Sequence, residues 1–531
     1  MTRFLDGLIG ALVLVLLGVL STGGWTVPMG PFPIPVRRAE DVVLAILPFL
    51  AFRCWLRPPT LPNIRPEGAV AAGVAIYTLV FSFITLTRHH TFQTHGMDLG
   101  YYAQEVWLMS RGLYPVVSVW AEIHAWGGHL DPIVPLLVPL AWIAPLADAL
   151  LVAQTLFLAL GAAPLYLLGR ARVGPGPAAA LALVYLLNPS LHGINVRDFH
   201  AAALAIPLLL TAMYAVESRS AWLFWIAAVL ALGTREDAAI PVVGLGLWLA
   251  LAKRRWVWGG AVVAGGLVWL VAAIHWLMPH FSGTPYPYLT ARYGHLGGSL
   301  GEIVLSPVLR PATVIGVLAS AGRVSYLAAI LAPLAFLPLF APLASVGAVT
   351  ALAQNLVNSD PVLFNYRTQY QSFVLPFLLV GAVGGLQRLQ RQPRAPSVRA
   401  VLAFAAFASV ALGARTANDL AVPRWWPGAR EHAARQILAQ IPPDASVSAW
   451  DRFTPHLAER TRVFIFPLGA DRSDYLALER GALTQGYKHD LSVARDGETV
   501  TIAFGGRTTQ RFGVVAEAGD FLLLRKMPAG S

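Results

Sequence analysis

The chain has 531 residues, of which 56% are hydrophobic and only 13% are charged, and its mean hydropathy is +0.59. Charged residues make up about a quarter of an ordinary soluble domain, so the composition excludes a soluble protein and predicts a polytopic α-helical membrane protein. The net charge of +11 does not indicate nucleic-acid binding, because the basic residues lie in short clusters between apolar runs, as topology determinants do. The single cysteine, Cys54, excludes an intrachain disulfide and a paired-cysteine metal site.

The first apolar run, residues 7–20, follows Arg3 and has two interpretations. A short apolar segment after a basic residue is typical of a signal peptide. The small-residue cleavage pattern at residues 19–23 is weak, however. We therefore expect an uncleaved first helix.

Apolar runs continue along the chain to about residue 416. Since about 20 apolar residues cross the hydrocarbon core, we expect about thirteen transmembrane helices. The candidate spans are residues 5–21, 41–56, 69–87, 148–169, 177–192, 200–216, 221–234, 237–252, 256–277, 324–341, 343–358, 370–386 and 400–416. Several are shorter than a full crossing, so the count depends on how the short runs join.

Clusters of Lys and Arg between the runs set the expected orientation. With a cytoplasmic amino terminus and thirteen spans, four clusters fall on the cytoplasmic side: Arg53 to Arg65, Arg170 and Arg172, Lys253 to Arg255, and Arg388 to Arg399. Arg37 and Arg38 fall outside and are the exception. The outer side then receives the loops 88–147 and 278–323 and everything after about residue 417.

The loop at residues 88–147 is the first large outer loop. It has helical periodicity at Leu99 to Met109, followed by a proline-rich apolar stretch from Pro132 to Pro145. Because proline interrupts a helix, we expect helices that lie along the membrane surface here rather than another span.

The composition changes after residue 417. An amphipathic helix is expected at residues 430–440, then a turn at Pro442 to Asp444. Short strands are expected at residues 445–450, 463–466, 475–478, 499–504 and 521–525. We therefore expect a multi-helix membrane domain at residues 1–416 and a small extracytoplasmic α/β domain at residues 417–531.

Four polar clusters lie in segments that the expected orientation places outside. They contain Asp98, Gln104, Glu105, His124, His129 and Asp131; Asn195, Arg197, Asp198 and His200; Arg235, Glu236 and Asp237; and the segment 358–370, which includes Arg367. Any one cluster is most simply the polar lining of a loop. Three adjacent charges within an apolar run are costly, however, unless they pair or face a cavity. The cytoplasmic loops hold few acids or histidines, so the clustering on one side indicates a site.

His129 and Asp131 are residue types that bind divalent cations. The spacing between His124 and His129 matches no strong metal motif. A divalent cation is therefore an open alternative, and we expect no other cofactor.

Four short motifs follow one another along the chain. They are Met97-Asp98-Leu99-Gly100 with Gln104, Gly128-His129-Leu130-Asp131-Pro132, Arg197-Asp198-Phe199-His200 and Arg235-Glu236-Asp237-Ala238. In this order they resemble a bacterial family of predicted membrane proteins, known as domain of unknown function 2079. The family usually has Phe at the first position, which Met97 replaces here. The resemblance covers about residues 75–480 and includes Ile441 to Ala445.

That family is similar to the GT-C superfamily of membrane glycosyltransferases, which take sugar from a polyprenyl-phosphate carrier. The resemblance implies a GT-C-like fold in the bacterial inner membrane, with Asp98 as the catalytic base on the first outer loop. A carboxylate can take the proton from an acceptor hydroxyl as it attacks the anomeric carbon. A single displacement of this kind inverts the anomeric configuration.

The leaving phosphate needs positive charge and hydrogen-bond donors. The candidate substrate- and phosphate-binding residues are Arg197, Asp198, His200, Arg235, Glu236, Asp237, Arg367 and Gln104. The expected partners are a polyprenyl-phosphate-linked sugar donor, a glycan, lipid or protein acceptor, and membrane lipid.

Two other functions stay open at this point. A transporter or flippase of a lipid-linked substrate should show repeat symmetry and ionisable residues within its helices, whereas we find no repeat and the charges lie at helix ends. A non-catalytic scaffold of envelope assembly would use the tail to bind partners, and the polar clusters argue against it only in part.

Overall fold

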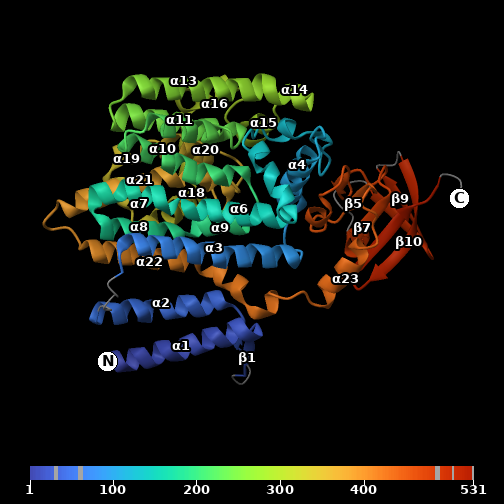
Figure 1. Cartoon of the computed structure of the whole chain (residues 1–531), viewed down its shortest axis with the longest axis horizontal. Helices are drawn as coiled ribbons and strands as arrows, with labels where there is room; N and C mark the ends of the chain where they lie inside the picture. Colours follow the sequence, from blue (N-terminus) through green and yellow to red (C-terminus); the bar gives the residue numbers. More distant parts are fainter. Residues whose placement is uncertain (29–33, 58–63, 485–490, 505–507, 529–531) are drawn as a thin grey trace.

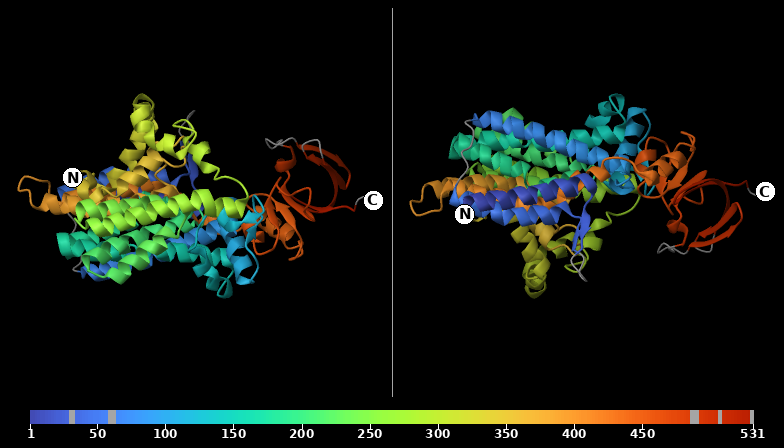
Figure 2. Two further views of the ribbon diagram at one scale, coloured as in Figure 1. Left: turned by 90° about the horizontal axis from the view of Figure 1, so that it is seen from above. Right: turned by 90° about the horizontal axis from the view of Figure 1, so that it is seen from below.

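The computed structural model describes residues 1–28, 34–57, 64–484, 491–504 and 508–528. A helical bundle lies along the long axis of the molecule, and a seven-stranded sheet lies beyond one end of it (Figure 1). The views from above and below show the same arrangement (Figure 2). We call the end of the bundle that faces this sheet the sheet end.

Six helical segments are long and apolar enough to cross a membrane. They are Thr2–Thr22 (α1), Pro66–His90 (α3), Leu146–Val173 (α6, Leu146–Leu160, and α7, Ala162–Val173), Pro175–Val196 (α8, Pro175–Leu186, and α9, Pro189–Val196), Trp256–Ser282 (α13, Trp256–Ala272, to α14, Met278–Ser282) and Val398–Leu420 (α22, Val398–Gly413, and η10, Ala414–Leu420). The pair α16 (Leu300–Leu309) and α17 (Pro311–Leu318), bent by 90°, makes seven if it is one span. Within the described part of the chain, the expected count of about thirteen is therefore not confirmed.

Several of the predicted spans fold as shorter helices. These are α10 (Ala205–Glu217), α11 (Ala221–Leu232), α12 (Ala239–Leu247), α18 (Ala321–Leu331), α19 (Pro342–Ser345), α20 (Ala348–Leu356) and α21 (Leu375–Gln390). Pro207, Pro241 and Pro376 lie in the first turns of α10, α12 and α21. Proline fits the first turn of a helix, and the residues before these helices form the 3₁₀ turns η3 (Ala201–Leu204), η4 (Glu236–Ala238) and η9 (Gln369–Phe373).

The segment 88–147 lies between the bundle and the sheet. It contains the π turn η1 (Gly96–Gly100), the helices α4 (Tyr101–Ser110) and α5 (Ala125–Gly128), a short hairpin of β3 (Val116–Val117) and β4 (Ile123–His124), and the 3₁₀ helix η2 (Val134–Trp142). The helix predicted at Leu99 to Met109 is confirmed by α4, and the proline-rich stretch is helical without forming a long span.

The carboxyl-terminal part is a helix followed by a mixed sheet. The helix is α23 (Ala429–Leu438), and the strands are β5 (Val447–Ala449), β6 (Val463–Ile465), β7 (Tyr475–Glu479), β8 (Leu491–Asp496), β9 (Thr499–Phe504), β10 (Thr508–Ala518) and β11 (Phe521–Lys526). Their order is β6-β5-β7-β11-β10-β9-β8, with β5 parallel to β6 and β7 and the other pairs antiparallel. The predicted helix and all five predicted strands are confirmed, and β8 and β10 are additional.

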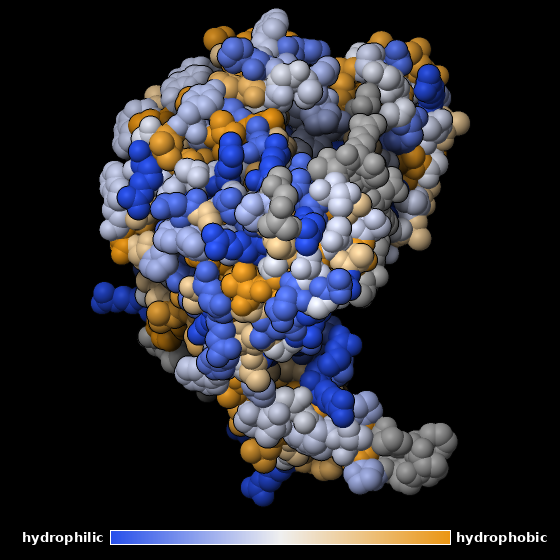
Figure 3. Space-filling view, turned by 90° about the vertical axis from the view of Figure 1, so that its right-hand side faces the viewer, coloured by the Kyte–Doolittle hydropathy of each residue, from blue (hydrophilic) through white to orange (hydrophobic). Residues whose placement is uncertain are grey.

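The sheet is joined to the segment 88–147 by a backbone hydrogen bond and an ion pair. Ile465 N–H donates to the carbonyl of Val119 at 2.8 Å, and Arg472 pairs with Glu122 at 2.6 Å. Phe453, which follows β5, belongs to the same buried apolar cluster as Leu99. Seen from the sheet side, the molecule presents mainly hydrophilic side chains (Figure 3). The sheet therefore covers the sheet end of the bundle as part of one packed body.

The helices α1 and α2 (Ala39–Leu56) form an amino-terminal hairpin beside the bundle (Figure 1). A short antiparallel pair, β1 (Trp25–Val27) and β2 (Ile34–Val36), connects them. At the sheet end, α1 contacts η11 (Val422–Arg424) and α2 contacts η10. This hairpin forms one wall of a pocket described below.

Candidate active site at the sheet end

Asp98 and His200 meet at the sheet end of the bundle. Asp98 lies in η1, just after the end of α3, and His200 directly precedes η3. The Nε2 atom of His200 lies 3.0 Å from Oδ1 of Asp98. The histidine side chain is 6% exposed, whereas the Asp98 side chain is 40% exposed. A buried histidine therefore contacts a carboxylate that a substrate can reach.

The charges around Asp98 keep it ionised. Burial opposes the charge of this carboxylate, but His200, His95 and Arg197 outweigh that effect and hold the pKa of Asp98 below its ordinary value. An ionised carboxylate is the form that can accept a proton from a substrate hydroxyl.

Asp198 supports the turn that carries Asp98. Its backbone has φ of 71°, a left-handed conformation that Asp adopts more readily than most residues. Its Oδ2 atom accepts a hydrogen bond from the backbone N–H of His95 at 2.9 Å. Burial, followed by the negative charge of Asp98, raises the pKa of Asp198 to about 6. Asp198, which belongs to the second motif, thus stabilises the turn of the first motif.

Gln154 of α6 holds the second motif in place. Its Nε2 donates to the carbonyl of Asp198 at 2.8 Å, and its Oε1 accepts the backbone N–H of His200 at 2.8 Å. The sequence interpretation did not single out Gln154. Its signal is a lone amide within an apolar run, since polar side chains inside membrane helices are usually functional or paired.

Asp451, which follows β5, stabilises the turn that carries Asp98. Its Oδ1 accepts the backbone N–H of Gly96 at 2.9 Å, and its Oδ2 lies 2.6 Å from Nδ1 of His95. A Cβ at Gly96 would lie 2.9 Å from Ile465, so only glycine allows this approach. The hydrogen bond to Asp451 raises the pKa of His95 against the effect of burial. Neither His95 nor Asp451 was predicted, because no local pattern links residues so distant in sequence.

The third motif contains a buried ion pair. Nε and Nη2 of Arg235 each lie 2.6 Å from a carboxylate oxygen of Asp237, and Gln354 donates to the same carboxylate at 2.9 Å. The guanidinium also stacks over Tyr370, 4.9 Å from the ring centre. Arg235 is only 4% exposed. Its charge is therefore already balanced within the protein.

Glu236 joins the third motif to the segment 88–147. Its carboxylate accepts the backbone N–H of Leu130 at 3.3 Å and the hydroxyl of Tyr286 at 3.4 Å, and it lies 3.3 Å from Nδ1 of His129. Asp131 is fully buried, and burial, followed by the charge of Glu236, raises its pKa well above the ordinary range. In the described residues, no group of three or more His, Cys, Asp or Glu side chains has an arrangement that could hold a metal ion.

Gln104 lies in the joint between α4 and the sheet. It is fully buried and donates to Ser118 Oγ at 2.9 Å and to the carbonyl of Arg460 at 3.1 Å. Its Oε1 accepts the backbone N–H of Ser118 at 2.8 Å. These contacts occupy both ends of its amide.

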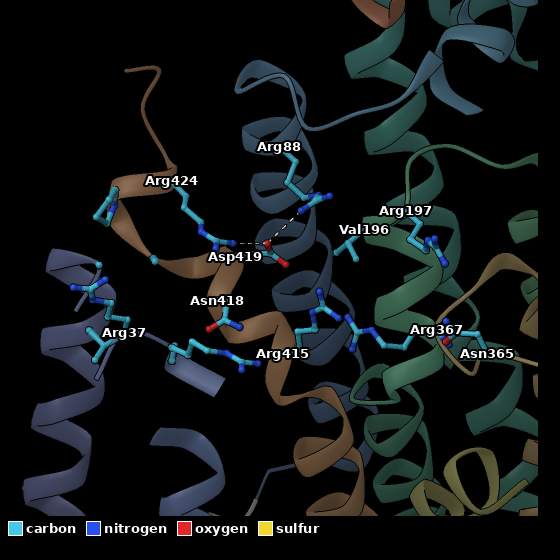
Figure 4. A pocket seen from close by; sticks show the side chains of 16 residues that line it. Arg37, Arg88, Val196, Arg197, Asn365, Arg367, Arg415, Asn418, Asp419 and Arg424 are labelled. Atoms are coloured by element: carbon cyan, nitrogen blue, oxygen red, sulfur yellow. Dashed lines mark hydrogen bonds and ion pairs between the residues drawn. The ribbon is translucent and has the colours of Figure 1, made fainter. Parts of the chain in front are cut away.

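Arg197 and Arg367 lie in a pocket of about 710 Å³ (Figure 4), and the charge of Arg197 also acts on Asp98. Arg37 and Arg424 lie on the opposite side of the pocket, which the amino-terminal hairpin and η11 form. Its charged lining consists of Arg37, Arg38, Arg88, Arg197, Arg367, Arg415, Arg424 and Asp419. We call this cavity the arginine pocket.

The structure thus sorts the predicted site residues into groups. Asp98, Arg197, Asp198 and His200 lie together, and Arg197 connects them to Arg367 through the arginine pocket. Arg235, Glu236, Asp237 and His129 form a second hydrogen-bonded group. Gln104 lies in the joint to the sheet.

Two solved structures have a similar fold. The structure of ArnT from Cupriavidus metallidurans bound to undecaprenyl phosphate has a TM-score of 0.51 at 15% sequence identity and covers 86% of this chain and 97% of its own. The structure of the same protein in the apo state has a TM-score of 0.50 at 15% identity, with 86% and 98% covered. No curated protein matches the sequence. The expected resemblance to the GT-C fold is confirmed.

A family model matches residues 88–485, which is most of the chain. This range contains all four motifs and excludes the amino-terminal hairpin. With its several apolar helices, the chain is a multi-pass membrane protein. It belongs to the family of predicted membrane proteins described as DUF2079.

Proposed function

We propose that this protein is an inverting membrane glycosyltransferase. It moves a sugar from a polyprenyl-phosphate carrier to an envelope acceptor at the outer face of the bacterial inner membrane. The observation that carries the proposal is the accessible Asp98 carboxylate, which follows an apolar helix, lies 3.0 Å from a buried His200 and has a pKa lowered by the charges around it. A lipid-linked sugar would present its anomeric carbon at this depth.

The reaction is a single displacement. Asp98 takes the proton of an acceptor hydroxyl while that oxygen forms a bond to the anomeric carbon. The bond from the anomeric carbon to the carrier oxygen breaks, and its electron pair leaves with the polyprenyl phosphate. Arg197, beside Asp98 and in the arginine pocket, is placed to balance the phosphate charge.

The other predicted residues have supporting roles in this proposal. His200 and Asp198 orient Asp98 and its turn, and Arg367 adds positive charge on the far side of Arg197. The third motif stabilises the packing around His129 through Glu236. It supplies no free cation, because Asp237 balances the charge of Arg235. Gln104 positions the sheet over the site.

The fold comparison supports a polyprenyl phosphate as the carrier. ArnT from Cupriavidus metallidurans, which has a similar fold, was solved bound to undecaprenyl phosphate. The charges of this chain lie at helix ends and turns instead of mid-span, which favours transfer at the surface over transport through the bilayer.

The test is transfer of label by the purified full chain in lipid vesicles. The vesicles contain a radiolabelled pool of polyprenyl-phosphate-linked sugars and are mixed with envelope acceptors. Asp98→Asn should lower the rate about 100-fold or more, as expected for loss of a general base. Asp520→Asn, which removes an exposed carboxylate of the sheet part, is the matched control and should retain the rate. Absence of transfer by the unaltered chain from every donor would favour the transporter or the scaffold.

A further inference from the structure

The arginine pocket holds more positive charge than the protein itself balances. Arg88 and Arg424 share Asp419, at 3.3 and 3.4 Å, and Arg38 pairs with Glu40. The remaining arginines of the lining have no carboxylate within ion-pair distance in the described part of the chain: Arg37, Arg197, Arg367 and Arg415. Four guanidinium groups around one cavity repel one another, so the pocket is suited to an anion.

One of these arginines also has an unused buried donor. Nη2 of Arg367 donates weakly to Thr416 Oγ1 at 3.4 Å, whereas its Nη1 is buried without a hydrogen-bond partner among the described residues. A Cβ at Gly193 of α9 would lie 2.5 Å from the Arg367 backbone, so the glycine lets this loop pack tightly against the bundle. A buried donor that is left unpaired is costly, and an anion in the pocket would satisfy it.

The pocket lies at one end of several candidate membrane spans, where the lipid headgroups of a bilayer are expected. Its lining comes from the ends of candidate spans: Val19 of α1 and Gly23 just after it, Arg88 of α3, Val196 of α9 and Arg415 after α22. The exposed apolar side chains of α1, such as Leu14 and Leu17, suit contact with lipid tails directly below. Basic pockets between membrane helices are known to bind anionic lipid headgroups.

The arginines also break the charge pattern of the rest of the chain. Arg170, Arg172 and Lys253 to Arg255 lie at the other end of the bundle, where the positive-inside rule places basic residues. Arg37 and Arg38, which are exceptions to that rule, line the arginine pocket. The expected membrane orientation does not explain these two arginines, whereas a bound anion does.

We propose that the arginine pocket is a binding site for the phosphate headgroup of an anionic membrane lipid. The hairpin of α1 and α2 completes the site from outside the family's matched region, residues 88–485. Arginine suits a phosphate monoester because its planar fork donates two parallel hydrogen bonds to the oxygens. The volume of about 710 Å³ leaves room for the groups that the phosphate carries. The site shares Arg197 and Arg367 with the carrier-phosphate contacts of the proposed function. Binding requires no turnover, so the site can be tested without transfer by Asp98.

The test measures binding to the purified full chain in phosphatidylcholine vesicles. The probes are phosphatidic acid, added phosphatidylcholine and inorganic phosphate. The double variant Arg37→Gln/Arg415→Gln should raise the apparent Kd for phosphatidic acid about tenfold or more, because two charge-assisted contacts are lost. Both residues are exposed and neither is part of the proposed reaction machinery, so the fold should persist.

A matched control removes two exposed arginines away from the pocket, with Arg394→Gln/Arg399→Gln. The control should leave the Kd for phosphatidic acid within about twofold of that of the unaltered chain. An equal loss in both double variants would overturn the proposal, because it would show diffuse attraction instead of a site. If inorganic phosphate displaces phosphatidic acid at equal concentration, the lipid assignment is wrong. Should the double variant fail to fold, Arg415→Gln alone should raise the Kd about threefold, and an unchanged Kd would contradict the site.

Discussion

Asp451 accepts the backbone N–H of Gly96 at 2.9 Å, which ties the sheet to the turn that carries Asp98. These residues are separated by most of the chain, yet their contact fixes the position of the proposed catalytic carboxylate. The sheet is therefore part of the site rather than an appended module. Its removal should abolish the geometry of the Asp98 turn.

Replacing Asp451 should affect stability in a pH-dependent way. The pKa of His95 is raised in the folded protein by Asp451, so this pair stabilises the fold below the unfolded pKa of histidine, about 6.5. The stabilisation is lost as pH rises through the folded pKa. Asp451→Asn should thus lower the melting temperature more at pH 6 than at pH 9. Since both side chains are partly exposed, the difference should be about 1 kcal/mol or less. An equal loss at both pH values would contradict the pairing.

Replacing Asp198 should change stability with pH in the same direction as replacing Asp451, but as a gain at high pH instead of a loss at low pH. Its pKa is raised to about 6 in the folded protein, whereas an unfolded aspartate has a pKa of about 3.9. The folded state therefore binds the proton more tightly, and this stabilisation is lost as pH rises from about 4 to above 6. Asp198→Asn keeps an acceptor for the His95 N–H. The difference in unfolding free energy between this variant and the unaltered chain should favour the variant by about 2 kcal/mol more at pH 8 than at pH 4. Thermal unfolding of both proteins at the two pH values tests this, and a gap that does not change with pH would contradict it.

Replacing His200 should change the pH dependence of transfer. The charge of His200 helps to hold the pKa of Asp98 below its ordinary value. In His200→Gln, the pKa of Asp98 should rise, so the acidic limb of the rate profile should move to higher pH. The rate at neutral pH should also fall about tenfold, because the carboxylate loses its orientation. His432→Gln, an exposed histidine of α23, is the control. An unshifted acidic limb in His200→Gln would exclude His200 as the positioning residue.

Removing only one partner of the Arg235–Asp237 ion pair should lower the free energy of unfolding. Arg235→Gln leaves a buried carboxylate without its partner, which typically costs about 3 kcal/mol or more. The double variant Arg235→Gln/Asp237→Asn removes both charges and should recover part of this loss. Unfolding free energies of the single and double variants give the coupling. Additive losses would show that the two side chains do not act as a pair.

Local patterns predicted the parts of the fold that depend on nearby residues. The periodicity at Leu99 to Met109 predicted α4, and short apolar runs after residue 445 predicted five of the strands. The span count depended on how short apolar runs join. Pro207, Pro241 and Pro376 delay the start of their helices, and the turns before them carry the polar motifs.

The site was predicted only where its residues lie in motifs. Asp98 and His200 belong to two such motifs, and the structure places them in contact. Asp451 could not be predicted, because its role requires the sheet to fold back onto η1. The arginine pocket likewise combines Arg37 and Arg415 from distant segments, which become neighbours only when the amino-terminal hairpin packs beside α22.

The central claim is that Asp98 accepts the proton in sugar transfer. The most direct measurement is the initial rate of label transfer from one polyprenyl-phosphate-linked donor by Asp98→Asn and by the unaltered chain, with equal amounts of folded protein in the same vesicles. Asp98→Asn should transfer the label at a rate lower by about 100-fold or more, with binding of the phosphate carrier retained. A variant that transfers the label at the unaltered rate would contradict it.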